Sequence, residues 1–221
     1  HSLRRRQRQM CIRDSYNILW HKQPKDILLA IEQAGRTCYK SEDKITETSA
    51  TPFVERLIAS GHESVLEHQS FSVRFITDRG VTHELVRHRL ASFSQESTRY
   101  CNYSKDKFGN ELTFILPTFL YGYGSDNPSW EHWQKAMEDS EDRYFELLED
   151  GLTPQDARSV LPNSLKTEIV VTANIREWRT ILKQRTSKKA HPQMRDLMIP
   201  LLYELDTCLT PLFHDIVDLN L

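Results

Sequence analysis

The sequence has few cysteines, and those it has do not form a motif. Cys11, Cys38, Cys101 and Cys208 are scattered over 221 residues, with no Cys-x-x-Cys pair and no short secreted framework around them. Zinc ribbons and disulfide-stapled scaffolds need closely and regularly spaced cysteines. Both classes are therefore excluded, and a reducing, cytoplasmic environment is expected.

Long apolar runs, a strong net charge and flexible linkers are also lacking. No stretch approaches the length of a membrane-spanning helix and the N-terminus has no signal-peptide core, so we expect neither a membrane protein nor a secreted one. The net charge of −2 argues against sequence-independent binding of nucleic acid, which needs a basic surface. No Pro-, Gly- or Ser-rich stretch divides the chain, which favours a single domain.

The beginning of the chain differs in character from the rest. It reads HSLRRRQRQMCIRDS, without apolar periodicity, and resembles translated vector or adapter sequence. A genuine basic, disordered arm is the alternative interpretation. We expect residues 1–15 to be a non-native or disordered segment and residues 16–221 to form the single domain.

Apolar periodicity and capping residues predict a mixture of helices and strands. Strands are expected at 71–75, 111–116 and 169–173. We expect Pro200 to kink the last helix, because proline removes a backbone donor. The mixture predicts an α+β fold, a mixed β-sheet flanked by helices. Helices are expected to begin at Pro24, Pro52, Val81, Trp130 and Pro154, and to cover the stretch after Asn174 as far as Arg185 and then residues 192–218.

The most informative segment is a cluster of cations between Arg87 and Arg99. It reads Arg87-His88-Arg89, then seven residues, then Ser97-Thr98-Arg99. Guanidinium groups match the oxygens of phosphates or ionised carbonyls, and clustering them is unfavourable unless an anion lies among them. A solvated basic turn is the alternative, since charge runs are usually surface features. We interpret the segment as an anion site, because an apolar segment leads directly into it.

This spacing of Arg-His-Arg and Ser-x-Arg resembles the signature of the flavin-dependent thymidylate synthases. Other motifs of that family lie before and after this segment in the order typical of the family, and the resemblance extends from about residue 24 to the C-terminus. They are Gly61-His62-Glu63-Ser64 with Glu67-His68, then Ala157-Arg158-Ser159-Val160-Leu161-Pro162, then Thr172-Ala173-Asn174-Ile175-Arg176-Glu177-Trp178, and Arg185 with Ala190-His191-Pro192-Gln193-Met194-Arg195.

The resemblance implies the fold of that family and a methyltransferase of dTMP biosynthesis. The reaction would be the reductive methylation of dUMP to dTMP, with FAD as cofactor, methylenetetrahydrofolate as carbon donor and NADPH as reductant. Residues 16–221 would be the catalytic domain of a cytoplasmic homotetramer with shared active sites, with no nucleic acid or membrane as partner. Hydride from the flavin completes the methyl group in that family. The protein therefore need only orient the reactants and stabilise negative charge.

The resemblance also implies a role for individual residues. Arg185 would be catalytic, because it would pair with uracil and favour its ionised form. Arg158 would reach the nucleotide from a neighbouring subunit. The dUMP set is Glu84, Leu85, Val86, Arg87, Gln95, Glu96, Ser97, Thr98, Arg99, Arg158 and Arg185. The FAD set is His62, Ser64, Glu67, Arg87, His88, Arg89, Gln95, Asn174, Ile175, Arg176 and Thr180.

A few positions depart from the pattern of the family or invite another role. Glu84 stands where a glutamine is common, and an ion pair with Arg87 is its alternative. Cys38 stands where a serine near the flavin is common, which puts that contact in question. Cys101 is expected to be a buried thiol in a strand, not a nucleophile. We expect no metal, because the nearby histidines form neither His-Glu-x-x-His nor His-x-x-Glu-His.

Two other functions compete with this interpretation. A non-catalytic nucleotide- or RNA-binding module would use the same arginine loop, but the weak net charge and the lack of interleaved aromatic residues count against it. A flavoprotein of the same fold would use a different acceptor. Bound oxidised flavin, which is yellow, separates the enzyme from the plain binding module.

Overall fold

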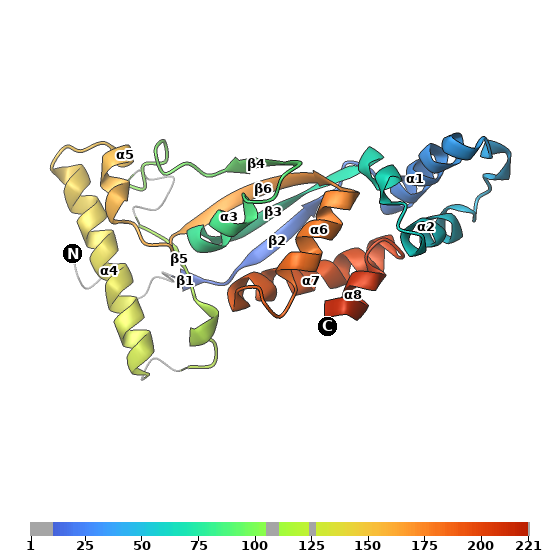
Figure 1. Cartoon of the computed structure of the whole chain (residues 1–221). Coiled ribbons are helices and arrows are strands. Elements are labelled where there is room, and N and C mark those ends of the chain that lie inside the picture. Colours follow the sequence, from blue (N-terminus) through green and yellow to red (C-terminus); the bar gives the residue numbers. More distant parts are fainter. Residues whose placement is uncertain (1–10, 105–110, 124–126, 221) are drawn as a thin grey trace. The chain divides into compact units, whose positions relative to one another are not determined.

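The structure is a computed structural model that describes residues 11–104, 111–123 and 127–220 (Figure 1). Most of the segment expected to be non-native or disordered lies outside these ranges. Within its remainder, strand β1 (Cys11–Ile12) is formed and strand β2 (Ser15–Leu19) begins. Among the described residues, regular structure is thus present from Cys11 onward, within the stretch 1–15 that was expected to be non-native or disordered.

The described residues combine helices with two β-sheets, and the chain has the predicted α+β class. The larger sheet has the order β2-β3-β6-β4, with β3 at Ser70–Asp78, β6 at Lys166–Asn174 and β4 at Ala91–Gln95. In the smaller sheet, β1 runs parallel to β5 (Phe114–Ile115) and Cys11 lies opposite Phe114. Phe114 also forms an antiparallel bridge with Leu165. Parallel and antiparallel pairings thus both occur, as the prediction of a mixed sheet requires.

The described residues form two compact units, each built from separate stretches of sequence. The first unit contains Phe75–Leu85, Ser94–Ile169 and the end of His1–Ser15. The second contains Tyr16–Arg74, Val86–Phe93 and Val170–Leu221. Strands β3, β4 and β6 each contribute residues to both units. The single catalytic domain over residues 16–221 stays a prediction.

In the first unit, helix α4 (Pro128–Glu149) begins and ends at capping residues. The Asn127 side chain accepts a hydrogen bond from the Ser129 amide, and the chain leaves the helix through Gly151, whose φ of 89° is left-handed. The apolar face of α4, which includes Tyr144, packs with Tyr103 and Phe114 in one core. The shorter helices of this unit are α3 (Arg79–Leu85), α5 (Pro154–Ala157), η5 (Thr118–Leu120) and η6 (Arg158–Val160).

In the second unit, helices α6 (Ile175–Arg185) and α7 (Pro192–Leu209) contact each other. Trp178 of α6 is fully buried, stacks on Phe71 of β3 at 5.0 Å between ring centroids, and donates to the Phe71 carbonyl at 3.1 Å. Helix α8 (His214–Asn220) contacts both α6 and α7. The remaining helices are α1 (Pro24–Tyr39), α2 (Ala50–Ala59), η2 (Glu42–Lys44) and η3 (Glu63–His68).

Several details of the predicted secondary structure are wrong. Three helices begin two residues earlier than expected: α2 at Ala50, α3 at Arg79 and α4 at Pro128. The helical stretch expected over 192–218 is not continuous: α7 contains Pro200 but ends at Leu209, because Thr210 precedes Pro211 and leaves the helical region with a ψ of 127°, and α8 follows as a separate helix. Residues 100–103 form no strand, because the amides of Tyr100 and Cys101 both bond the Ser97 carbonyl in a turn. The strand expected over 111–116 is confined to Phe114–Ile115.

Candidate functional site

In the second unit, two of the predicted motifs meet through their side chains. Nε of Arg185, at the end of α6, donates a hydrogen bond to Nε2 of His88 at 2.9 Å. On the other side of the imidazole, Nδ1 lies 3.7 Å from Oε1 of Glu177. His88 is 7% exposed. Burial, followed by the charge of Arg185, lowers the pKa of His88 from 6.5 to about 4, so the ring is neutral at pH 7.

The arginines on either side of His88 are exposed to solvent. Arg87 and Arg89 precede a left-handed turn at Leu90, whose φ is 61° and whose side chain is 80% exposed. A buried neutral imidazole therefore alternates with two exposed cations. This gives the Arg-His-Arg segment one residue directed into the unit and two that are available to an anion.

Another group of residues predicted to bind FAD lies at the junction of β6 and α6. Asn174 caps α6 as expected and accepts from the Glu177 amide at 2.8 Å, while the Ile175 amide donates to the Gln69 carbonyl at 2.9 Å. Two amides at this helix N-terminus are thus engaged within the protein. An anion here would be held by the exposed Arg176 side chain, which forms an ion pair with Glu67 at 2.6 Å. Thr180 is exposed and its hydroxyl donates to the Arg176 carbonyl of the same helix.

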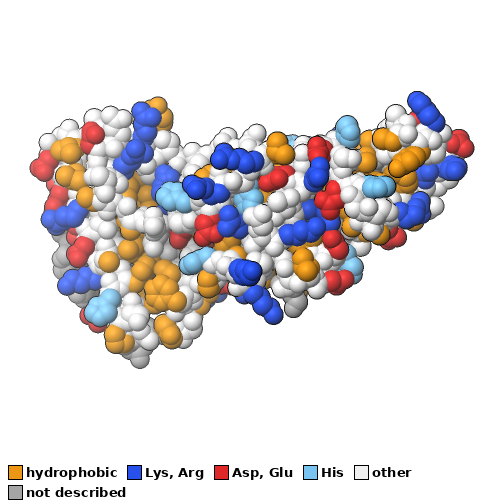
Figure 2. All heavy atoms as spheres, viewed as in Figure 1, with side chains coloured by type: hydrophobic (Ala, Val, Ile, Leu, Met, Phe, Trp, Pro, Cys, Tyr) orange, Lys and Arg blue, Asp and Glu red, His pale blue; other side chains and the backbone are white. Residues whose placement is uncertain are grey.

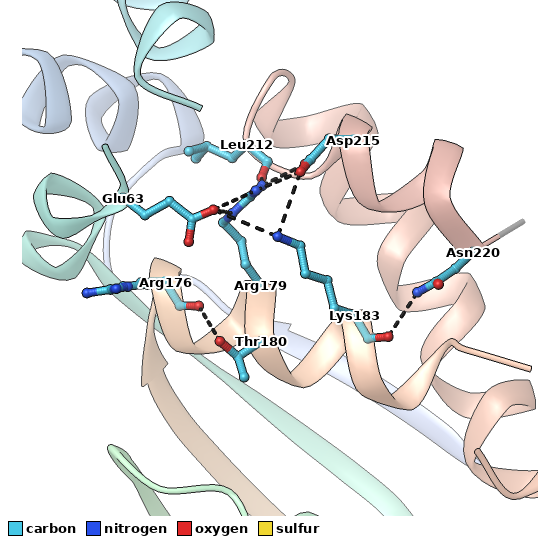
Figure 3. A network of polar contacts seen from close by, with 8 residues as sticks. All are labelled: Glu63, Arg176, Arg179, Thr180, Lys183, Leu212, Asp215 and Asn220. Atoms are coloured by element: carbon cyan, nitrogen blue, oxygen red, sulfur yellow. Dashed lines mark hydrogen bonds and ion pairs between the residues drawn. The ribbon is translucent and has the colours of Figure 1, made fainter. Parts of the chain in front are cut away.

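A buried arginine that the sequence did not single out links this helix to its neighbours (Figure 3). Arg179 is 1% exposed and donates to Glu63 of η3 at 3.0 Å and to both carboxylate oxygens of Asp215 of α8 at 2.8 Å. It also donates to the Leu212 carbonyl. Lys183 lies 3.8 Å from Glu63 and 3.9 Å from Asp215. Exposed His62, Ser64 and Glu67, the predicted flavin residues, flank or belong to η3, the segment that Arg179 fixes through Glu63.

In the first unit, two arginines converge on one hydroxyl within the signature. The Oγ1 atom of Thr98 accepts from Nη1 of Arg158 at 3.3 Å and from Nη2 of Arg79 at 3.4 Å. Arg79 also donates to the Glu96 carbonyl at 3.4 Å. Thr98 is buried, whereas Arg158 and Arg99 are exposed. The structure thus brings Arg158 to the Ser-x-Arg motif of its own chain and adds Arg79, which the sequence did not single out.

The residues just before Thr98 belong to a polar network. Glu96 accepts from the Tyr103 hydroxyl at 2.9 Å and lies 3.3 Å from Nζ of Lys166, which is 2.6 Å from Glu168. Burial, followed by the Glu96 charge, raises the pKa of Tyr103. The side-chain amide of Gln95 donates to the Thr82 hydroxyl at 2.9 Å. Glu96 and Gln95 therefore serve to hold the loop that presents Ser97 and Arg99.

The remaining predicted residues lie at the end of α3 and just after it. The Leu85 side chain is 1% exposed, so a contact from this position to a nucleotide would come from the backbone. Glu84 is half-buried and Val86 is 37% exposed. Both proposed roles of Glu84 stay predictions. Cys38, at the end of α1, is exposed.

The described residues contain no group of three or more His, Cys, Asp or Glu side chains placed to hold a metal ion. None of the helices in the described ranges is long and apolar enough to span a membrane. On the face drawn in Figure 2, acidic and basic side chains are interspersed with hydrophobic ones. The positive charge of the predicted site is therefore local, in agreement with the net charge of −2.

Comparison with known proteins identifies a family whose matched region contains these motifs. The family model described as thymidylate synthase complementing protein matches residues 21–209. A flavin-dependent thymidylate synthase of Geobacter sulfurreducens is 34% identical over 193 residues, which cover 84% of this chain and 80% of that protein. This chain belongs to the thymidylate synthase complementing protein family.

Other members of the family show similar agreement. The flavin-dependent thymidylate synthase of Pyrococcus abyssi is 35% identical over 167 residues, which cover 75% of this chain and 66% of the relative. That of Mycolicibacterium vanbaalenii is 37% identical over 204 residues, which cover 84% and 78%. The family match includes Arg87, Arg99, Arg158 and Arg185. The site residues thus lie inside the region that defines membership of the thymidylate synthase complementing protein family.

Proposed function

We propose that this chain catalyses the reductive methylation of dUMP to dTMP, with methylenetetrahydrofolate as carbon donor, NADPH as reductant and FAD as the bound flavin. Membership of the family and the name of its relatives, flavin-dependent thymidylate synthase, support this reaction. The contact between His88 and Arg185 carries the proposal, because it joins two motifs that are 97 residues apart in the sequence. A chance resemblance of separate motifs would not require them to meet.

The chemistry of the residues in the second unit fits a flavin dinucleotide. Such a cofactor carries two phosphates, and Arg87, Arg89 and Arg176 are exposed cations of one unit. His62 and Ser64 add exposed polar groups. When bound, the reduced flavin supplies the hydride that completes the methyl group. The residues proposed to hold it are His62, Ser64, Glu67, Arg87, His88, Arg89, Gln95, Asn174, Ile175, Arg176 and Thr180.

The proposed substrate carries negative charge at its phosphate and, during the reaction, on its pyrimidine ring. Ser97 and Arg99 would bind the phosphate, with Arg158 nearby. Arg185 would stabilise the charge that develops as C5 of uracil attacks the methylene carbon of the folate. The residues proposed to bind dUMP are Glu84, Leu85, Val86, Arg87, Gln95, Glu96, Ser97, Thr98, Arg99, Arg158 and Arg185.

The proposed active enzyme is a cytoplasmic homotetramer whose active sites are shared between subunits. Arg158 would then act on the nucleotide of a neighbouring subunit, although within its own chain it contacts Thr98. The signature arginines belong to both units, with Arg99 and Arg158 in the first and Arg87 and Arg185 in the second. Closed symmetric assemblies readily build one site from several chains.

An assay in which each component is omitted in turn tests this function. Purified protein should be yellow and should form dTMP only when dUMP, methylenetetrahydrofolate, flavin and NADPH are all present. A colourless protein that binds dUMP without turnover would instead be the nucleotide-binding module. A yellow protein that oxidises NADPH but forms no dTMP would be a flavoprotein with another acceptor. Both results would contradict the proposed reaction.

A further inference from the structure

His88 lies between two side chains of α6 that are eight residues apart, Glu177 and Arg185. Its Nε2 atom is 2.9 Å from Nε of Arg185 and its Nδ1 atom is 3.7 Å from Oε1 of Glu177. The side chain of His88 is 4% exposed and that of Glu177 is 12% exposed. The imidazole is therefore enclosed and has a defined partner on each side.

The identity of these partners fixes the protonation of the ring. A guanidinium Nε always carries its hydrogen and only donates, so Nε2 of His88 must accept. A neutral imidazole then carries its proton on Nδ1, the atom that faces the Glu177 carboxylate. Burial and the nearby Arg185 charge lower the pKa of His88 to about 4, which agrees with a neutral ring at pH 7.

We propose that His88 is a positioning residue that holds the guanidinium of Arg185 in one orientation, and that the nearby Glu177 carboxylate supports the tautomer protonated at Nδ1 in which it does so. This inference rests on the proposed function for its effect on the reaction. Arg185 is the last residue of α6, and its side chain is long and flexible. Fixing Nε in advance removes rotational freedom of the guanidinium before a ligand binds.

The inference gives His88 a different role from the flavin contact that its motif implies. Arg87 and Arg89 are exposed, whereas His88 is almost completely enclosed by protein. A residue that contacts a ligand and a residue that acts through Arg185 differ in one measurable property. If His88 acts through Arg185, replacing His88 no longer changes the rate once Arg185 has been removed.

The tautomer is tested without any assay of activity. In protein labelled with ¹⁵N-histidine, the spectrum of His88→Gln identifies the His88 signals among those of nine histidines. We expect His88 of the wild-type protein at pH 7 to be neutral and protonated at Nδ1. A ring protonated at Nε2, or at both nitrogens, would contradict the proposal even if the enzyme is active.

The positioning role is tested first by single-turnover methyl transfer in three single variants. His88→Leu should slow transfer about tenfold to a hundredfold and leave KM for dUMP nearly unchanged, as expected for loss of an orienting partner. His88→Gln should recover most of the rate, because its amide oxygen can accept from Nε. His132→Leu, at an exposed site on α4, is the matched control and should behave like wild type.

The deciding comparison is made in the Arg185→Ala background. There, the further change His88→Leu should alter the rate less than about twofold, because the partner that His88 orients is absent. A full additional loss would show that His88 acts independently of Arg185 and would overturn the proposal. If wild-type protein forms no dTMP at all, the proposed function fails, and the tautomer measurement still decides the placement of His88.

Discussion

At the scale of single residues, His88 gives the protein a defined sensitivity to acid. Its pKa is lowered to about 4 by burial and by Arg185, whereas the unfolded chain has the ordinary value of 6.5. Between these values the unfolded chain binds a proton that the folded protein does not. The free energy of unfolding should therefore fall as the pH drops from 6.5 to about 4, by on the order of 3 kcal/mol.

Urea denaturation at pH 7 and pH 4.5 measures this contribution. The wild-type protein should lose more stability between the two pH values than His88→Leu, which has no imidazole to protonate. Equal losses in the two proteins would show that the imidazole is as accessible to protons in the folded state as in the unfolded one.

Cys101 is the tempting nucleophile, since it lies two residues after Arg99. Its side chain is partly buried and packs against the core of the first unit that includes Tyr103 and Tyr144. Because the proposed reaction needs no protein nucleophile, Cys101→Ala should keep turnover within a few-fold of wild type. Abolished turnover with intact folding and flavin binding would overturn the flavin-only mechanism.

The sequence singled out residues within motifs but gave no indication of their partners in the fold. Arg87 and Arg99 were singled out by the spacing within one short segment, and Arg185 by the resemblance to the family. Arg179 was missed because its partners Glu63 and Asp215 are 116 and 36 residues away, and no local pattern marks a buried arginine. Arg79 was missed for the same reason, since its contact to Thr98 depends on how the chain returns after α3.

At the scale of elements, local signals predicted some helix starts to the residue and others to within two residues. Helices α1, α5 and α6 begin where proline or Asn174 predicted, since these residues act on the first helical turn itself. Strand β4 was not predicted, because Ala91–Gln95 contains a single large apolar residue and depends on pairing within the sheet. Sheet order likewise depends on segments that are distant in the sequence.

Arg179 connects α6 to η3 and α8 through side-chain hydrogen bonds to Glu63 and Asp215 (Figure 3). Arg179→Met keeps the apolar stem but leaves the carboxylates of Glu63 and Asp215 without their buried partner. It should lower the free energy of unfolding by about 3 kcal/mol. Arg143→Met, which breaks an exposed pair with Glu146, is the control and should cost less than about 1 kcal/mol. Equal effects would show that the buried network is no more stabilising than a surface pair.

The same contact has a pH dependence of its own. Burial opposes ionisation of Asp215, but the hydrogen bond and charge of Arg179 outweigh it, so the pKa is lowered from 3.8. Stability from this pair is therefore fully present above pH 3.8 and is lost as the pH falls below it. Arg179→Met should show a smaller loss of stability over that acidic range than wild type, as measured by urea denaturation.

At the scale of the whole molecule, we propose that the active sites are shared between subunits. Arg158 belongs to the first unit and Arg185 to the second. If sites are shared between subunits, mixing inactive Arg158→Ala with inactive Arg185→Ala should restore part of the activity after subunit exchange, because some sites regain both arginines. No recovery, despite exchange shown by mass, would indicate sites confined to one chain.

The central claim is that this chain transfers a one-carbon unit to dUMP, with Arg185 stabilising the charge that develops on the ring. The most direct measurement is a single turnover of reduced flavoprotein with dUMP and methylenetetrahydrofolate labelled with ¹³C in the methylene group. Wild-type protein should form dTMP with the label in its methyl group. Arg185→Ala should remain yellow when oxidised and be slower by on the order of a hundredfold to a thousandfold. Absence of labelled dTMP from wild-type protein, or an unchanged rate in Arg185→Ala, would contradict the account.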